Sequence, residues 1–489
     1  MNNKIKLLPG IPDDDNRHFL PEELKESEIV VNENGNNSQV YPKNLKEYRA
    51  CLIDDNEDTW YEYVPDSYDP GRKTPLVLSM HGGLMTGWGQ CVYTSWSLIA
   101  DREGFIVVYP DAHSRRFWQV EYEKDACEDI SKPNEEGLYM QDFPEDIREN
   151  NDARIALKLI DLMKEKYNID EERIYMQGMS LGNHMTAMMA RYYGYRFAAV
   201  AGSAGTATEG LIFDKNNQPI NEGGPVPVWQ ARMEYDIAPF GSSLPVEEVV
   251  VRNREYWLRV NECGSLPRLK IDGEHNYAFY RGKKADFVFC DVSGRDHGQT
   301  FDDAELAWDY LFSGTRRLAD GTIKYTAPEL PREGDKKAIA AADGCTCIWI
   351  NGEKRELPAP ALLWKKLKYH GVEGDPIVRG EYCMIPLRFI ADLSAQEYKE
   401  CGGWAEMKLE DGRVLQFSRG CIGCTIDNRV RSMLCEPIER NGMLYISIEW
   451  FCREILQMHV STSGNVMYAT DHYSRLSVNM ARLIRDLLR

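Results

Sequence analysis

The sequence has no long apolar run and no excess of positive charge. No segment approaches the roughly 18 consecutive apolar residues of a membrane-spanning helix, and residues 1–12 contain no apolar stretch long enough for a signal peptide. Its 58 basic residues are outnumbered by 77 acidic ones, for a formal net charge of −19. This charge disfavours nucleic acid and anionic membranes as partners. We therefore expect a cytoplasmic protein that binds neither, or a secreted one if a leader has been removed.

The 13 cysteines lack the regular spacing of a disulfide framework. Their number is odd, and several fall in apolar segments such as 287–290, which favours buried, reduced thiols. Cys345 with Cys347, and Cys421 with Cys424, have spacings seen in zinc sites. One C-x-x-C motif beside an irregular pair is weak evidence for zinc. We expect neither a metal nor an organic cofactor.

At 489 residues and 43% apolar composition, the chain is long enough for two or three domains. Residues 1–45 are polar and are expected to form an irregular lead-in. Over residues 46–315, apolar strand-like runs alternate with helical segments, which indicates an α/β domain with a doubly wound, mostly parallel sheet. Glycine, proline and charged residues dominate the expected linker, residues 316–344. Residues 345–489 predict a smaller α+β domain.

The C-terminal part contains a faint internal repeat. Residues 380–391 and 441–452 each couple a short strand to a short helix. The tail, residues 474–489, is expected to form an amphipathic helix that packs on its own domain. The apolar stripe of this helix comprises Leu476, Met480, Leu483 and Leu487.

The strongest functional signal is the pentapeptide Gly-Met-Ser-Leu-Gly at residues 178–182. A β-prone run precedes it and a helix-forming stretch follows, which is the context of a nucleophile elbow. So sharp a turn strains the serine backbone, and side chains in place of the two glycines would collide with the neighbouring strand and helix. Ser180 is therefore the predicted nucleophile.

A serine nucleophile needs a base, usually a histidine, that a carboxylate orients. Three histidines follow Ser180 within the domain. His297 lies in the loop after the predicted strand 285–290, at the carboxyl edge of the sheet, and is the predicted base. His184 is one turn along the elbow helix and is expected to be structural, while His275 lies in a charged segment and is expected to be solvated.

The predicted acid is Asp236, which follows the strand at residues 226–229 and a short polar connection. Glu234 is the second choice by position. Asp296 is adjacent to His297 in sequence, where it would orient the imidazole poorly through Nδ1, and is interpreted as a loop charge.

Two backbone amides should stabilise the oxyanion. One is the amide of Leu181, directly after the nucleophile. The other is expected from the turn after the strand at residues 75–80, at Gly83 or Leu84.

Residues 112–146 form a long segment without periodicity, which predicts a lid or a pocket wall. Its aromatic residues are candidates for stacking on a sugar or phenolic ring, or alternatively a cluster that plugs the domain surface. These candidates are Phe117, Trp118, Tyr122 and Tyr139.

Together these segments resemble the α/β-hydrolase superfamily, and within it the group of polyhydroxybutyrate depolymerases and feruloyl or acetylxylan esterases. The matching segments are residues 76–84, 100–111, 174–182, 226–239 and 296–297. The resemblance covers about residues 45–315. It implies a serine carboxylic-ester hydrolase that acts through an acyl-enzyme on acyl or hydroxycinnamoyl esters of carbohydrates.

The sequence departs from this group at two places. Leu181 stands where members commonly have Asn or Gly, and Gln230-Ala231-Arg232 replaces the usual His-Gly strand end before the acid. Two other functions remain open. One is a serine peptidase of the same fold, although no propeller domain is evident, and the other is a non-catalytic binding protein built on the hydrolase scaffold.

Residues 345–489 resemble the stalk-type domain first described at the N-terminus of copper amine oxidases, which is common in clostridial surface proteins and points to a bacterial source. The matching residues are 348–352, 385–390 and 443–448. The second repeat copy departs from the pattern, with Ile-Ser-Ile-Glu in place of Val-Pro-Leu-Arg. The resemblance implies a module for spacing or interaction, without catalysis or copper. This domain is the candidate surface for a homo-oligomer.

Overall fold

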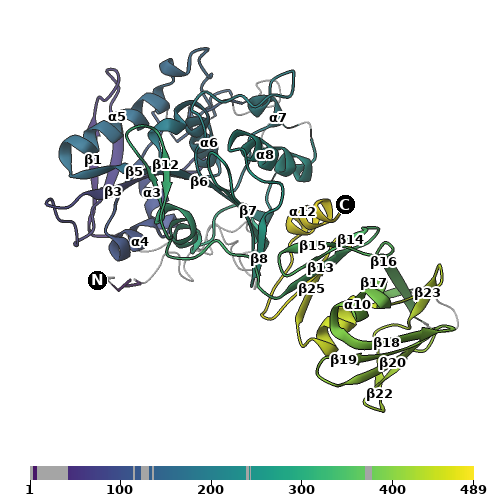
Figure 1. The fold of residues 1–489 in the computed structure, drawn as a ribbon. Coiled ribbons are helices and arrows are strands. Elements are labelled where there is room, and N and C mark those ends of the chain that lie inside the picture. The colour runs from purple at the N-terminus through teal and green to yellow at the C-terminus, as the bar shows by residue number, and fades with distance from the viewer. Residues whose placement is uncertain are drawn as a thin grey trace, which may run out of the picture. The chain divides into compact units, whose positions relative to one another are not determined.

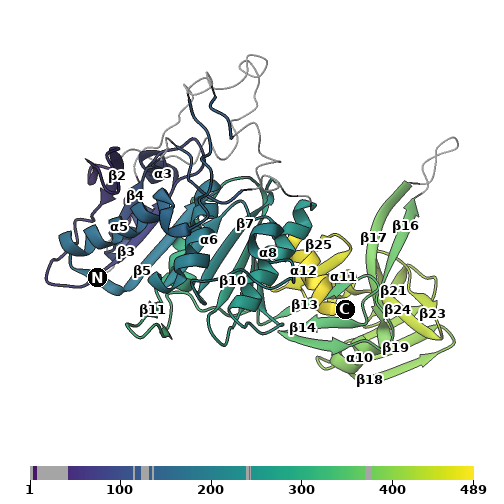
Figure 2. The same cartoon turned by 90° about the horizontal axis from the view of Figure 1, so that it is seen from above.

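The chain divides into two compact units (Figure 1 and Figure 2). One comprises Met1–Pro267 and Tyr277–Arg332, and the other Arg268–Asn276 and Glu333–Arg489. The computed structural model describes residues 4–7, 42–113, 116–122, 131–134, 137–237, 242, 244–368 and 377–489. Almost all of the expected lead-in, residues 1–45, lies outside these ranges. Within them, no helix combines the length and apolar character needed to cross a membrane.

Strands and helices alternate through the first part of the chain. In order they are β1 Leu45–Ala50, β2 Asp58–Tyr63, β3 Thr74–Met80, α3 Gly87–Tyr93, α4 Trp96–Glu103, β4 Ile106–Pro110, η3 Ile147–Glu149, α5 Asn151–Lys166, β5 Ile169–Met179, α6 Leu181–Tyr193, η4 Gly194–Arg196, β6 Ala199–Ser203, α7 Glu209–Ile212, β7 Val228–Tyr235, α8 Val246–Val260, β8 Arg268–Asp272, β9 His275–Tyr280, β10 Phe287–Asp296, α9 Asp303–Ala307, the π-helix η5 Trp308–Phe312, β11 Thr315–Arg317 and β12 Ile323–Tyr325.

Ten strands form one sheet in the order β1-β2-β4-β3-β5-β6-β7-β10-β9-β8. The six strands from β4 to β10 in that order pair in parallel, while β1 and β2 are antiparallel. Strands β3, β4 and β6 are buried along their whole length, as in a parallel sheet whose two faces are both covered. This is the doubly wound α/β-hydrolase fold that the sequence predicted. The carboxyl ends of the parallel strands lie at one edge.

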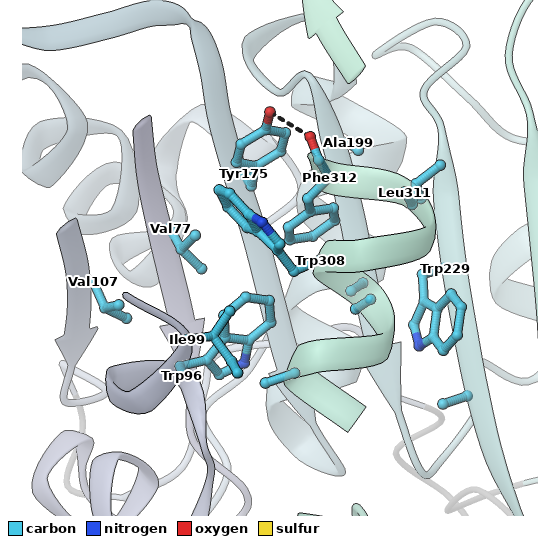
Figure 3. Packing of buried hydrophobic residues seen from close by; sticks show 14 of the residues in the cluster. Val77, Trp96, Ile99, Val107, Tyr175, Ala199, Trp229, Trp308, Leu311 and Phe312 are labelled. Carbon is cyan, nitrogen blue, oxygen red and sulfur yellow. Dashed lines mark hydrogen bonds between the residues drawn. The ribbon is translucent and has the colours of Figure 1, made fainter. Parts of the chain in front are cut away.

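The core on one face of this sheet is aromatic (Figure 3). Trp308 and Phe312 of the closing helix pack on Tyr175 of β5, and Trp96 of α4 stacks on Phe312. The Tyr175 hydroxyl donates to the Phe312 carbonyl oxygen over 2.7 Å, which satisfies a polar group inside the core. The strand that carries the nucleophile elbow is thus fixed from its buried side.

The described residues of the second unit, 333–368 and 377–489, form three antiparallel sheets and two short helical segments besides the C-terminal helix. Its elements after β12 are β13 Ala338–Ala342, β14 Cys347–Ile350, β15 Glu353–Glu356, β16 Leu362–Lys368, β17 Ile377–Pro386, α10 Leu387–Ser394, β18 Ala395–Cys401, β19 Trp404–Leu409, β20 Val414–Ser418, β21 Gly423–Ile426, β22 Arg429–Ser432, β23 Ile438–Arg440, β24 Met443–Ser447, α11 Ile448–Trp450, η6 Phe451–Ile455, β25 His459–Ser463, β26 Val466–Thr470 and α12 Val478–Leu488. The strand orders are β15-β14-β13-β26-β25, β16-β17-β24-β23 and β18 through β22 in sequence.

The internal repeat is visible as structure. In each copy a strand, β17 or β24, runs directly into a helix, α10 or α11. The two strands pair antiparallel, and Ile385 lies opposite Ile446, its equivalent in the other copy. The two copies are therefore related by a local two-fold axis through this pair.

The expected linker, residues 316–344, is not a connector without structure. Its first part forms the β11–β12 hairpin of the first unit, and β13 lies in the middle of a five-stranded sheet of the second. The glycine and charged residues of this segment belong to tight turns between short strands and do not form a flexible tether. The twelve cysteines in the described ranges are free thiols, and no group of three His, Cys, Asp or Glu residues there is arranged to hold a metal ion.

Candidate active site

Ser180 occupies the sharp turn between β5 and α6. Its backbone has φ 55° and ψ −118°, which is a strained conformation for a residue other than glycine. A Cβ on Gly178 would lie 1.9 Å from the carbonyl oxygen of Gly182, and one on Gly182 would lie 2.2 Å from that of Met80. Both glycines are therefore required for the turn to form.

Three parallel strands bring their carboxyl ends together around this serine. Ser180 follows β5, Asp236 follows β7, and His297 follows β10. His297 Nε2 lies 2.8 Å from Ser180 Oγ, and its Nδ1 lies 2.5 Å from Asp236 Oδ1. The predicted serine, histidine and aspartate thus form one continuous hydrogen-bonded chain.

Asp236 is held from several sides. Its Oδ2 accepts a hydrogen bond from the amide of Gly205 over 2.9 Å, and its Oδ1 accepts one from the amide of Ile237 over 2.9 Å. Burial raises the pKa of this carboxyl, but the bond to His297 and the charge of Arg232, together with the other partners, hold it below its ordinary value. Asp236 is therefore ionised at neutral pH.

The alternative acids are engaged elsewhere or exposed. Glu234 accepts hydrogen bonds from the Ser293 hydroxyl over 3.0 Å and from the amide of Gly294 over 2.6 Å, so it braces β10. Asp296 is exposed to solvent.

His184 contacts Ser180 through the backbone only, since its amide donates to the Ser180 carbonyl oxygen over 3.1 Å. His184 lies on α6 beside Gly205, and burial lowers the pKa of its imidazole to about 4. His275 begins β9 and is half-buried rather than in a solvated loop. The charged residues around His275 in the sequence gave no indication that strand β9 begins there.

The structure favours two of the three backbone amides predicted as candidates for binding the oxyanion. Leu181 is the first residue of α6, where the amide has no carbonyl partner within the helix. The amide of Leu84 donates to the carbonyl oxygen of Arg116 over 3.0 Å, which favours Gly83 over Leu84 as the second oxyanion donor. Gly83 remains, and a Cβ on it would lie 3.8 Å from Leu181 Cβ. Leu181 and Gly83 thus face one another across the site.

A buried histidine fixes the turn that carries Gly83. The amide of Ala112 donates to His81 Nε2 over 3.1 Å, so Nδ1 carries the proton and donates to the carbonyl oxygen of Gly82 over 2.7 Å. Burial lowers the pKa of His81 to about 4, so the ring is neutral. The indole of Trp118 stacks on it and donates to the His81 carbonyl oxygen over 2.7 Å.

A cavity of about 520 Å³ opens beside the nucleophile. It is lined by Gly82, Gly83, Met85, Trp88, Gly89, Val92, Tyr93, Met179, Ser180 and His297. Four of these ten residues belong to helix α3, which the sequence did not predict to be part of the site. The helix is short and begins Gly-Trp-Gly, so it carries little helical signal.

The four aromatic residues predicted to bind substrate do not line this cavity. Trp118 is fully buried, and the Tyr122 hydroxyl donates to the carbonyl oxygen of Met140 over 3.4 Å. Phe117 packs near Gly83, and Tyr139 is half-buried away from the cavity lining. The alternative interpretation, aromatic residues packed into the domain, fits Trp118. Part of the predicted lid, including residues 123–130, lies outside the described residues.

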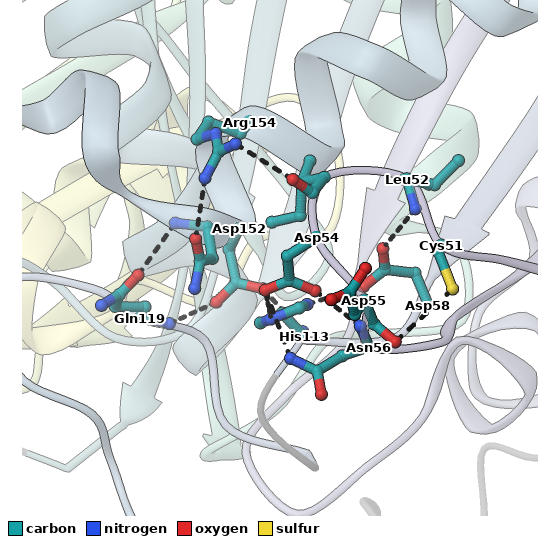
Figure 4. Close-up of polar contacts among 12 residues, drawn as sticks. Cys51, Leu52, Asp54, Asp55, Asn56, Asp58, His113, Gln119, Asp152 and Arg154 are labelled. Carbon is teal, nitrogen blue, oxygen red and sulfur yellow. Dashed lines mark hydrogen bonds and ion pairs between the residues drawn. The ribbon is translucent and has the colours of Figure 1, made fainter.

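A cluster of carboxylates anchors the start of that segment (Figure 4). Asp152, at the first turn of α5, accepts the amides of His113 over 2.8 Å and Gln119 over 2.5 Å. The imidazole of His113 lies between Asp58, 2.7 Å away, and Asp54, 3.2 Å away. Burial raises the pKa of Asp152 to about 6. These contacts hold Trp118, and through it His81, in place.

The similarity to known proteins lies in the part of the chain that holds most of this site. Residues 55–271 match the family described as Esterase. The N-terminal domain is therefore similar to that family over these residues. Over 158 residues the chain is 31% identical to a bifunctional acetylxylan esterase/xylanase of Neocallimastix patriciarum, an alignment that covers 32% of this chain and 19% of the relative.

The chain is also similar to a second curated relative and to a solved structure. Over 146 residues it is 28% identical to poly(3-hydroxyalkanoate) depolymerase C of Paucimonas lemoignei, which covers 30% of each chain. The solved structure of an acetyl xylan esterase from Aspergillus awamori matches with a TM-score of 0.39 and 18% identity, over 55% of this chain and 99% of that one. The chain spans less than a third of the length of the two curated relatives.

Proposed function

We propose that this protein is a serine carboxylic-ester hydrolase that acts through an acyl-enzyme on acyl or hydroxycinnamoyl esters of carbohydrates. The observation that carries the proposal is the hydrogen-bonded chain from Ser180 through His297 to Asp236, at the mouth of an apolar cavity. A serine hydroxyl bonded to the imidazole of a histidine whose other nitrogen faces a buried carboxylate is arranged for proton transfer.

In the acylation step, Ser180 Oγ attacks the ester carbonyl carbon while its proton passes to His297 Nε2. The new imidazolium keeps its Nδ1 proton, and the ionised Asp236 stabilises the charge. The carbonyl oxygen becomes an oxyanion that accepts hydrogen bonds from the amides of Leu181 and Gly83. When the C–O bond breaks, His297 returns the proton to the leaving alcohol, and the acyl group stays on Ser180.

Deacylation reverses these roles with water as the nucleophile. His297 takes a proton from the water, the hydroxyl adds to the acyl carbon, and the tetrahedral oxyanion forms again at the same two amides. Its collapse releases the carboxylic acid and restores the Ser180 hydroxyl with the proton from His297. No step requires a metal ion or an organic cofactor.

The cavity supports a substrate with a sizeable apolar acyl group. Met85, Trp88, Val92 and Tyr93 provide one continuous apolar wall, and an acetyl group would fill little of about 520 Å³. An indole at the rim suits a phenolic ring. One relative named above is an acetylxylan esterase/xylanase. Acetyl esters and hydroxycinnamoyl esters should therefore both be tested as substrates.

Reaction with a fluorophosphonate, followed by peptide mapping, tests the nucleophile directly. We expect modification at Ser180 in the wild-type protein and none in Ser180→Ala. Turnover of p-nitrophenyl acetate and methyl ferulate then tests the activity. Well-folded protein that neither reacts with the probe nor hydrolyses these esters would contradict the proposal and favour the binding-protein alternative.

Two further expectations complete this proposal. We place the enzyme in the cytoplasm, where free thiols persist and soluble oligosaccharide esters would be its substrates. We assign homo-oligomer formation to the C-terminal domain. Light scattering of the full chain and of a chain ending at residue 332 compares the two masses, and equal association in both would remove that role from the domain.

A further inference from the structure

A buried arginine lies behind the carboxylate of the triad. Arg232 belongs to β7, four residues before Asp236, and its side chain is 2% exposed. Its Nη1 lies 3.4 Å from Asp236 Oδ2, and its Nη2 donates to the Asp236 carbonyl oxygen over 3.5 Å. The resemblance noted above expects His-Gly at this strand end, where this sequence has Gln230-Ala231-Arg232.

The two oxygens of Asp236 have different neighbours as a result. Oδ1 faces His297 and the amide of Ile237, whereas Oδ2 faces Arg232 and the amide of Gly205. The side chain of Asp236 has no exposed surface. A buried charge without a partner is costly, so the guanidinium stabilises the ionised carboxylate and also holds its orientation.

Few other ionisable groups face this pair. Asp291 on β10 lies opposite Arg232 in the parallel register, so both side chains leave the same face of the sheet. Glu234 lies two residues further along β7 and is bound to β10. His184 on α6 interacts electrostatically with Asp236 and His297, but burial lowers its pKa to about 4, so it is neutral at neutral pH. Within the described ranges, Nε and Nη1 of Arg232 make no hydrogen bond, so its close interaction is the ion pair with Asp236.

We infer that Arg232 is a positioning residue that acts through Asp236: it keeps the carboxylate ionised and oriented, and it sets the pH at which His297 becomes a working base. This inference rests on the proposed function. The guanidinium partly offsets the negative charge that His297 experiences, which disfavours the imidazolium and keeps the imidazole free to accept the serine proton at lower pH.

Removal of the Arg232 guanidinium should shift the acidic limb of the kcat/KM profile to higher pH. Without it, the unopposed carboxylate would favour the imidazolium, and Asp236 itself would be easier to protonate. Both effects remove the working base at a higher pH. In Arg232→Met we therefore expect the midpoint of the acidic limb of kcat/KM to rise by about one pH unit.

The test compares pH profiles of p-nitrophenyl acetate hydrolysis for wild type, Arg232→Met and Arg232→Lys, with p-nitrophenolate read at its isosbestic wavelength. Lysine retains the charge, so its limb should stay near that of the wild type even if kcat falls. Arg254→Met is the matched control, because Arg254 on α8 is also buried but its guanidinium lies over the ring of Phe289 on β10. A limb in Arg232→Met that matches wild type would overturn the inference.

The wild-type protein separates this inference from the function on which it rests. Absence of both turnover and fluorophosphonate labelling in wild type rejects the function itself, whereas turnover with an unshifted variant limb rejects only the role of Arg232. If Arg232→Met does not fold, the double variant Arg232→Met/Asp236→Asn decides. Recovery of the fold shows that the guanidinium serves the carboxylate, and failure to recover assigns Arg232 to packing and overturns the inference.

Discussion

Gln177 donates a hydrogen bond of 3.0 Å to Gln299, although 122 residues separate them in the chain. Gln177 lies three residues before Ser180, and Gln299 lies two residues after His297. The bond therefore links the strand that carries the nucleophile to the loop that carries the base. Gln177 Oε1 also accepts from the Ser79 hydroxyl over 2.8 Å and the Trp96 indole over 2.9 Å.

Replacement of Gln177 by Leu should destabilise the protein and slow turnover. It leaves buried donors and acceptors without partners, which costs about 2 kcal/mol in the free energy of unfolding, and it loosens the distance between Ser180 and His297. Urea unfolding and kcat measure the two effects. Gln396→Leu, on an exposed strand position, is the control and should change neither. Unchanged stability in Gln177→Leu would show that the network is not needed.

Removal of the serine hydroxyl should abolish turnover and leave the fold intact. In Ser180→Ala we expect kcat to fall by at least about 10⁴-fold, because the nucleophile and its bond to His297 are lost together. The circular dichroism spectrum and the unfolding midpoint should stay close to those of wild type. Substantial residual hydrolysis would place the nucleophile elsewhere.

The strained backbone at Ser180 can be measured as stability. Glycine adopts positive φ without steric cost, so Ser180→Gly should be more stable than Ser180→Ala by about 1 kcal/mol. Urea unfolding of the two inactive variants gives this difference directly. Equal stability would mean that the turn stores no strain in the folded protein.

Trp88 should discriminate between acyl groups. Its side chain is 38% exposed at the rim of the cavity. In Trp88→Ala we expect KM for methyl ferulate to rise about tenfold, because an apolar contact with the phenolic ring is lost, while KM for p-nitrophenyl acetate changes less. Trp404→Ala removes a tryptophan of similar exposure, 37%, from β19 and should affect neither substrate.

The neutral imidazole of His81 should make the protein sensitive to acid. Its pKa is lowered from 6.5 to about 4 in the folded state, so between these values the unfolded chain binds more protons and stability falls as the pH falls. The shift corresponds to about 3 kcal/mol lost by pH 4. His81→Gln should be less stable at pH 7 but should lose less on acidification. Parallel stability curves for the two proteins would contradict this account.

The sequence was sufficient for the parts of the site that local geometry determines. The elbow around Ser180 requires Gly178 and Gly182 because their neighbours leave no room for a side chain. Five consecutive residues, 178–182, were therefore enough to predict it. Asp236 and His297 were found from strand order, since strands of a parallel sheet end at one edge. Contacts within the fold then bring them together.

The sequence failed where packing decides the outcome. Trp118 looked like a ligand-binding residue, but its indole faces His81 inside the domain. Four residues of the cavity wall come instead from α3, where Gly87 lies so close to β4 that a Cβ would be 2.2 Å from the carbonyl oxygen of Tyr109. Residues 338–342 were assigned to the linker because glycine, proline and charged residues dominate the segment to which they belong, although their alanine side chains suit a buried central strand.

The pairing of β17 with β24 determines what would happen to a fragment that carries only one copy of the repeat. Because Ile385 lies opposite its own repeat equivalent, Ile446, each copy supplies the hydrogen-bonding edge that the other copy needs. A fragment that carries one copy would expose an unpaired strand and would be driven to associate with a second fragment through the same edge. Duplication within one chain converts what would otherwise be a symmetric association between molecules into an internal contact.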